Sequence, residues 1–329
     1  MCGQSAIIYA SDFRKCKEML DGLDMRVLHE FPFINAFGVC CHPRDISEIA
    51  SLLYVKNIAP QTTAYTLVDA AREVMNIRAM HGRGIFGEGV TLAVIDTGVY
   101  PHLDFMVPQP RLLEFVDFID GKEEPYDDNG HGTFVAAVAC GNGVKSCGKY
   151  KGIAPRAGLI ALRAMNKKGE GGAFGILQAM QWVFDNAESY GIKVCCMSFG
   201  SSVTGADDPL IEGAEALWKK GIVVVAAAGN NGPEAHTIKS PGASSLIITV
   251  GAMHDGREEG ESGAVRTIRR QFMKDYKVAE FSSRGPVGNL VKPDIVAPAV
   301  DIISASNDDK LFYSKMSGTS VAVPLYCVR

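Results

Sequence analysis

The sequence lacks several features that would assign it to a particular class of protein. It has 33 Lys and Arg against 37 Asp and Glu, a formal net charge of -4, so it has no excess of basic residues for binding polyanions. Nucleic acid is therefore not expected as a partner. Residues 1–5 contain no basic start followed by an apolar run, and the apolar stretches elsewhere are far shorter than a membrane span. We expect a cytoplasmic protein with no membrane partner.

The cysteines also lack the usual patterns. There are nine, an odd number, with two adjacent pairs and no C-x-x-C, so neither a disulfide framework nor a zinc site is supported. The Cys40-Cys41-His42 run resembles a ligand cluster, but neighbouring strand residues point to opposite faces of a sheet. Small buried hydrophobic residues are the favoured interpretation, and no metal site is assigned.

The length and composition predict about two domains with a sizeable core, because the chain has 329 residues, of which 47% are hydrophobic. The pattern changes near residue 68. Before it, apolar runs predict strands at 6–9, 34–41 and 54–58, with helices starting at Ser11 and after Asp45. Residues 1–68 are thus predicted to form a small α+β domain and residues 69–329 a larger one.

Within the larger domain, short apolar runs alternate with amphipathic helical segments. The runs are wholly apolar or nearly so, as expected for strands buried on both faces, and they cover residues 91–95, 158–162, 193–197, 222–228 and 246–250. This alternation predicts an α/β fold with a doubly wound, mostly parallel sheet, in which ligands bind beyond the carboxyl ends of the strands. The charged residues 254–277 are interpreted as a surface insertion.

The first chemical motif is Asp96-Thr97-Gly98, which places a carboxylate at the end of an apolar strand. Taken alone, it could be an ordinary turn. Aspartic proteases also carry Asp-Thr-Gly, but their two carboxylates must share one proton, and this chain has a single copy. That interpretation would require a dimer.

The second motif surrounds His131 with glycines in residues 127–133, followed by small and apolar residues that can pack closely as a helix. A lone histidine is more often structural. The third motif is residues 316–324, in which Ser320 follows a Gly-Thr turn, and the fourth is residues 223–232, where a strand reduced to alanines precedes Gly229-Asn230. Together they supply a nucleophile, a base, a carboxylate and an amide donor.

These motifs resemble those of the subtilisin-like serine proteases, and the order Asp, His, Ser along the chain is that of the family. The resemblance covers about residues 85–324 and includes Ser198-Phe199-Gly200 and residues 281–286 and 292–298. It implies a serine endopeptidase acting on protein or peptide substrates, with Ser320 as nucleophile, His131 as base and Asp96 as its partner. Asn230 and the Ser320 backbone N–H would form the oxyanion hole.

The resemblance further implies a substrate cleft and a zymogen. The substrate-binding residues would be Ser198, Phe199, Gly200, Ala227, Ala228, Gly229, Gly169 and Gly171. The small residues at 227–229 suggest space for a large apolar side chain. The domain at 1–68 resembles a propeptide that inhibits its own enzyme, with cleavage near residues 64–68. Calcium is common in the family, but no ligand loop is matched and no cofactor is assigned.

The sequence departs from the family most clearly at its end. After Pro324 the family continues through a long helix, whereas five residues remain here. We therefore expect an incomplete catalytic domain. The alternative function is a truncated, catalytically impaired remnant that acts only as a binding or inhibitory fragment.

Overall fold

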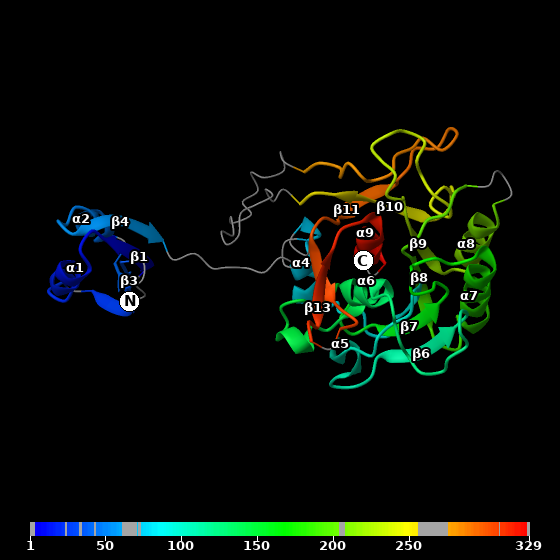
Figure 1. The fold of residues 1–329 in the computed structure, drawn as a ribbon, viewed down its shortest axis with the longest axis horizontal. Helices are drawn as coiled ribbons and strands as arrows, with labels where there is room; N and C mark the ends of the chain where they lie inside the picture. The colour runs from blue at the N-terminus through cyan, green and yellow to red at the C-terminus, as the bar shows by residue number, and fades with distance from the viewer. Residues whose placement is uncertain are drawn as a thin grey trace. The chain divides into compact units, whose positions relative to one another are not determined.

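The computed structural model describes residues 4–23, 25–32, 35–42, 44–60, 71, 74–203, 208–255, 276–308 and 310–327. The described residues up to Pro60 form one compact unit and those from Ala71 onward another, each with its own sheet (Figure 1). The predicted boundary near residue 68 and the predicted processing segment fall within residues 61–70, outside the described residues. So does most of the predicted surface insertion, at residues 256–275.

The N-terminal unit is the predicted α+β type. Its sheet has the order β2-β3-β1-β4 with antiparallel neighbours. The elements follow one another as β1 (Gln4–Ala10), α1 (Phe13–Leu20), β2 (Arg26–Phe31), β3 (Ala36–Cys41), α2 (Ile46–Ala50) and β4 (Val55–Pro60). Ile8, Leu20 and Phe37 are buried in a core of their own.

Two details of this unit differ from the sequence prediction. Helix α1 begins after Asp12 rather than Ser11, because the Asp12 carboxylate accepts the Lys15 backbone N–H at 3.2 Å and caps the first turn. Strand β2 was not predicted. No residue of β2 is buried, so it has no apolar alternation to reveal it.

The second unit is built on a seven-stranded sheet in which every neighbouring pair is parallel, as predicted for the α/β fold. The strand order is β11-β10-β9-β8-β5-β7-β6. The strands are β5 (Thr91–Asp96), β6 (Leu112–Asp117), β7 (Gly158–Arg163), β8 (Ile192–Met197), β9 (Val223–Ala227), β10 (Ile248–Met253) and β11 (Ile295–Pro298).

Helices cover both faces of this sheet (Figure 1). One face packs against α7 (Ala173–Asn186) and α8 (Pro209–Lys219), and the other against α6 (His131–Cys140) and α9 (Thr319–Tyr326). The smaller elements are α4 (Ile77–Gly82), α5 (Leu103–Met106), the 3-10 turn at Val144–Ser146, and a hairpin of β12 (Ile302–Ala305) and β13 (Tyr313–Met316). The doubly wound arrangement brings the starts of α6 and α9 to one face of the sheet.

The described residues contain neither a membrane-spanning helix nor a cluster of metal-binding side chains. None of their helices is both long and apolar enough to cross a membrane. None of the described His, Cys, Asp and Glu side chains gather in a group of three or more that could hold a metal ion.

Candidate active site

The site is built where three neighbouring strands end. Asp96 is the last residue of β5, Ser198 follows the last residue of β8, and Asn230 lies three residues beyond β9. Because these strands are parallel and adjacent, their carboxyl ends share one edge of the sheet. Two helices that pack against each other on one face supply the rest: His131 begins α6, and Ser320 is the second residue of α9.

Asp96 and His131 are in direct contact. The Nδ1 atom of His131 lies 2.7 Å from Oδ1 of Asp96, a hydrogen-bond distance. The Asp96 side chain is only 1% exposed, whereas the imidazole is 27% exposed. The carboxylate therefore fixes the buried side of the ring, and the Nε2 side remains accessible to a reacting group.

Glycine allows this contact. A Cβ atom at Gly132 would collide with the carbonyl oxygen of Gly98 and lie 3.2 Å from the Cβ of Asp96. The backbone of α6 can thus approach the end of β5 only because residue 132 has no side chain.

A hydrogen-bond network that the sequence did not reveal holds the two loops together. The Thr97 hydroxyl accepts the Gly132 N–H at 2.9 Å and donates to Oδ1 of Asp127 at 2.9 Å. The other oxygen of Asp127 accepts the backbone N–H of Thr133 at 2.9 Å and its hydroxyl at 2.6 Å. Thr97 and Asp127 were visible inside the motifs, but their pairing depends on the fold.

The electrostatics of His131 suit a base that becomes charged during a reaction. Burial by itself would lower the pKa of His131, because a charged ring is poorly solvated there. The Asp96 charge, the hydrogen bond that His131 donates to Asp96 and the more distant charge of Asp127 outweigh this effect and leave the pKa raised. The site therefore stabilises an imidazolium.

Asn230 and Ser320 lie on either side of one small space. The Oδ1 atom of Asn230 accepts both the backbone N–H and the hydroxyl of Thr319, each at 2.9 Å. This orientation leaves the Nδ2 group as a donor. A Cβ atom at Gly318 would lie 3.2 Å from Oγ of Ser320 and 3.4 Å from Nδ2 of Asn230, so both groups border the same space.

A proline explains the role of Ser198. Pro324 lies within α9 and has no N–H, so the carbonyl of Ser320, four residues earlier, loses its usual helical donor. The Ser198 hydroxyl donates to that carbonyl at 2.9 Å. The side chain of Ser198, predicted to bind substrate, is therefore engaged in supporting the nucleophile turn.

Replacing Ser198 with alanine is expected to lower the free energy of unfolding by about 1 kcal/mol, since the Ser320 carbonyl would lose its donor. Urea unfolding of both forms measures the difference. Ser201→Ala, at an exposed neighbouring serine, is the control and should stay within about 0.5 kcal/mol of wild type. Equal losses in the two variants would contradict the role given to Ser198.

The other predicted cleft residues occupy varied surroundings. Ala227 and Ala228 are buried, and Phe199 packs partly against the core on the α7 and α8 face. Gly169 lies near Asn129, whose amide donates to the Lys167 carbonyl at 3.0 Å. A Cβ at Gly171 would lie 2.5 Å from the Ala164 carbonyl oxygen. The 169–171 loop is thus placed beside the segment that leads to His131.

The space beside Gly229 differs from the expectation of a large apolar pocket. A Cβ atom at Gly229 would lie 2.6 Å from Cγ of Lys239, and one at Gly200 would lie 2.8 Å from Cβ of the same lysine. The lysine stem thus occupies part of this space. Lys239 was missed because nothing in its local sequence marks it.

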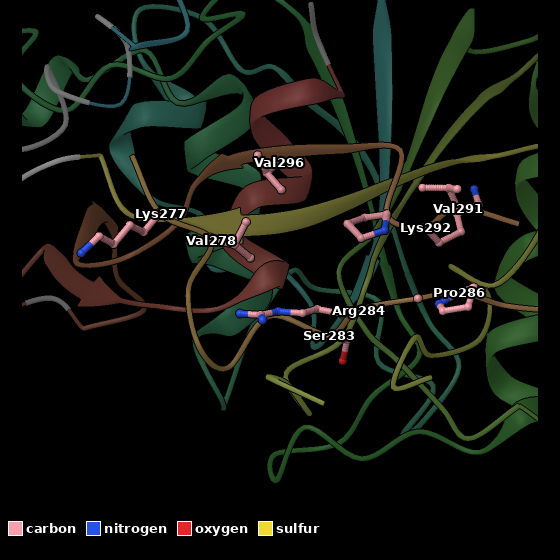
Figure 2. A pocket seen from close by; sticks show the side chains of 10 residues that line it. Lys277, Val278, Ser283, Arg284, Pro286, Val291, Lys292 and Val296 are labelled. Carbon is pink, nitrogen blue, oxygen red and sulfur yellow. The ribbon is translucent and has the colours of Figure 1, made fainter. Parts of the chain in front are cut away.

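An open depression of about 710 Å³ lies elsewhere on the second unit (Figure 2). Its lining includes Val278, Arg284, Val291, Lys292 and Val296. Neither the Asp96–His131 pair nor Ser320 nor Asn230 borders it. The depression is therefore not part of the candidate active site, despite its size.

Comparisons with known proteins agree with the fold. Residues 87–327 match the Subtilase family, Peptidase_S8. Serine protease AprX of Bacillus subtilis is 40% identical over 318 residues, which cover 88% of this chain and 68% of AprX. The alkaline protease of Alkalihalobacillus alcalophilus is 29% identical over 92% of this chain and 70% of its own length.

Solved structures give the same result. One described as S41 Psychrophilic Protease superposes with a TM-score of 0.63 at 28% identity, covering 81% of this chain and 83% of the other. A cold adapted subtilisin-like serine proteinase gives 0.56 at 27% identity, covering 73% of each chain. With its parallel sheet and the family match over most of its length, this chain belongs to the subtilase family.

Proposed function

We propose that this member of a family of serine-type endopeptidases hydrolyses peptide bonds through Ser320, His131 and Asp96. The observation that carries the proposal is the 2.7 Å contact between Asp96 and His131, at the same sheet edge as the Ser320 turn. A serine hydroxyl is a weak nucleophile unless an oriented base takes its proton.

In the proposed reaction, the Ser320 hydroxyl attacks the scissile carbonyl while Nε2 of His131 accepts its proton. The Asp96 carboxylate holds the ring through Nδ1 and stabilises the imidazolium that forms. The Nδ2 group of Asn230 and the Ser320 N–H donate to the oxyanion. His131 then protonates the leaving amine, and water hydrolyses the resulting ester by the same steps in reverse.

A fluorophosphonate probe tests this assignment, because it reacts with activated serines. Wild-type protein should be labelled and Ser320→Ala should not, while the control Ser314→Ala, in β13, should label like wild type. Labelling that survives Ser320→Ala would reject the nucleophile. A folded wild-type protein that is not labelled would favour the alternative of a catalytically impaired remnant.

The raised pKa of His131 predicts how activity depends on pH. The base must be neutral to accept the serine proton, so kcat/KM should fall as the pH drops through the pKa of His131. Because that pKa is raised, the midpoint should lie above the ordinary imidazole value of about 6.5. A pH profile with a peptide substrate measures it, and a midpoint below 6.5 would contradict the electrostatic account.

The N-terminal unit is proposed to act as an intramolecular inhibitor, which would make the chain a zymogen. Its separate core and its place before the second unit in the amino-acid sequence support this role. Mass spectrometry of the purified chain over time should show cleavage near residues 64–68 in wild type and an intact chain in Ser320→Ala.

A cytoplasmic location remains a prediction from the sequence.

A further inference from the structure

Lys239 lies between two segments, 198–200 and 227–229, to which the family resemblance gives a role in substrate binding. Its backbone N–H donates to the Ala228 carbonyl at 2.9 Å, and the next residue, Ser240, pairs with Ser201 through hydrogen bonds of 2.9 and 3.0 Å. The Lys239 backbone is thereby held between the end of β9 and the segment after β8.

The first carbons of the Lys239 side chain lie beside Gly200 and Gly229, one glycine in each segment. Its Cβ and Cγ atoms lie so close to Gly200 and Gly229 that a Cβ at either glycine would be within 2.8 Å of the lysine stem. Glycine at both positions therefore makes room for the stem.

Both segments are also tied to the Ser320 turn. The Gly229 N–H donates to the Thr319 hydroxyl at 3.2 Å, and the Ser198 hydroxyl donates to the Ser320 carbonyl at 2.9 Å. A substrate side chain that enters between these segments, next to the scissile bond, would thus meet the lysine.

Lys239 has no counter-ion among the described residues of the second unit. Among residues 74–203, 208–255, 276–308 and 310–327, the structure pairs no carboxylate with the partly buried Lys239. The carboxylate of Asp208 in the adjoining segment is occupied, since it caps α8 and accepts the Ser240 hydroxyl at 2.7 Å. A lysine without a counter-ion favours an anionic ligand, which can accept a charge-assisted hydrogen bond.

We propose that Lys239 directs the protease to peptide bonds that follow an acidic residue, an inference that rests on the proposed function. The glutamate or aspartate carboxylate on the acyl side of the scissile bond accepts a charge-assisted hydrogen bond from Nζ of Lys239. The stem of the lysine fills the space that would otherwise accept a large apolar side chain.

Peptides that differ only in the residue before the scissile bond test the proposal. Wild type should cleave after Glu with a kcat/KM at least about tenfold above that after the isosteric Gln, as expected for a hydrogen bond to a charged group. Lys239→Met keeps the stem without the charge and should bring the Glu-to-Gln ratio close to 1. Lys239→Glu should favour Lys over Glu.

Lys193→Met removes an exposed lysine near the amino end of β8, opposite the site, and should keep the wild-type ratio. A Glu-to-Gln ratio that Lys239→Met leaves unchanged would overturn the proposal, as would a wild-type ratio near 1. If no peptide is cleaved and the fluorophosphonate probe does not react, the proposed function fails instead. A labelled enzyme with no acidic preference is thus distinguishable from an inactive one.

Discussion

Replacing His131 with alanine is expected to lower kcat by about 10⁶-fold, about as much as removing the Ser320 hydroxyl. The imidazole contacts the Asp96 carboxylate and leaves its other ring nitrogen on the exposed side of the site. Without it, the Ser320 hydroxyl has no base. Nucleophile and base act as one unit, so removing either should cost about as much as removing both.

The measurement is kcat for His131→Ala, Ser320→Ala and the double variant with one peptide substrate. All three should agree within about tenfold. His236→Ala, at an exposed histidine of the same unit, should retain activity and serves as the control. A double variant far slower than both single variants would show that the two residues act separately.

Asp96→Asn should lower kcat by about 10⁴-fold while leaving the fold intact. The asparagine amide has the size of the carboxylate, but it holds the ring in the wrong tautomer and offers no charge to the imidazolium. The substitution also removes the main cause of the raised pKa of His131, because burial then acts with less opposition. The midpoint of the residual pH profile should therefore move down.

The matched control for Asp96→Asn is Asp185→Asn, at an exposed carboxylate on α7 that accepts a side-chain hydrogen bond from Gln181. It should leave both kcat and the pH midpoint unchanged. If Asp96→Asn lowered kcat without moving the midpoint, the carboxylate would act by orientation alone. A loss below about tenfold would remove Asp96 from the proposed mechanism.

The residues proposed for the chemistry could be predicted because each has a local signal. Asp96 follows an apolar strand, glycines flank His131, and Ser320 follows a glycine turn. Such signals depend on a few neighbours in the chain. The parallel sheet was predictable for the same reason, since strands buried on both faces are continuous apolar runs.

The supporting contacts could not be predicted, because each joins distant parts of the chain. Ser198 and Ser320 are 122 residues apart, and Thr97 and Asp127 are 30 apart. Strand β6 was missed because half of its residues are only partly buried and one is exposed, so it gives no continuous apolar run. Lys239 acquires its position only when the ends of β8 and β9 meet.

Helix α9 is more stable than its length alone would predict. An isolated helix of 8 residues would be marginal in water. Here Val321, Ala322 and Val323 are at most 1% exposed, and the helix packs on α6 and on strands β8 to β11. Burial, rather than helix length, stabilises the turn that presents Ser320.

The proline within α9 links the position of Ser320 to that of the segment at the end of β8. Since Pro324 donates nothing to the Ser320 carbonyl, the nucleophile is anchored by a residue of the strand-end segment proposed to pair with substrate. A displacement of that segment would therefore act on Ser320 through this hydrogen bond. Pro324→Ala would add a backbone N–H that competes with Ser198 for the Ser320 carbonyl. The position of Ser320 would then be set by α9 itself rather than by the segment at the end of β8.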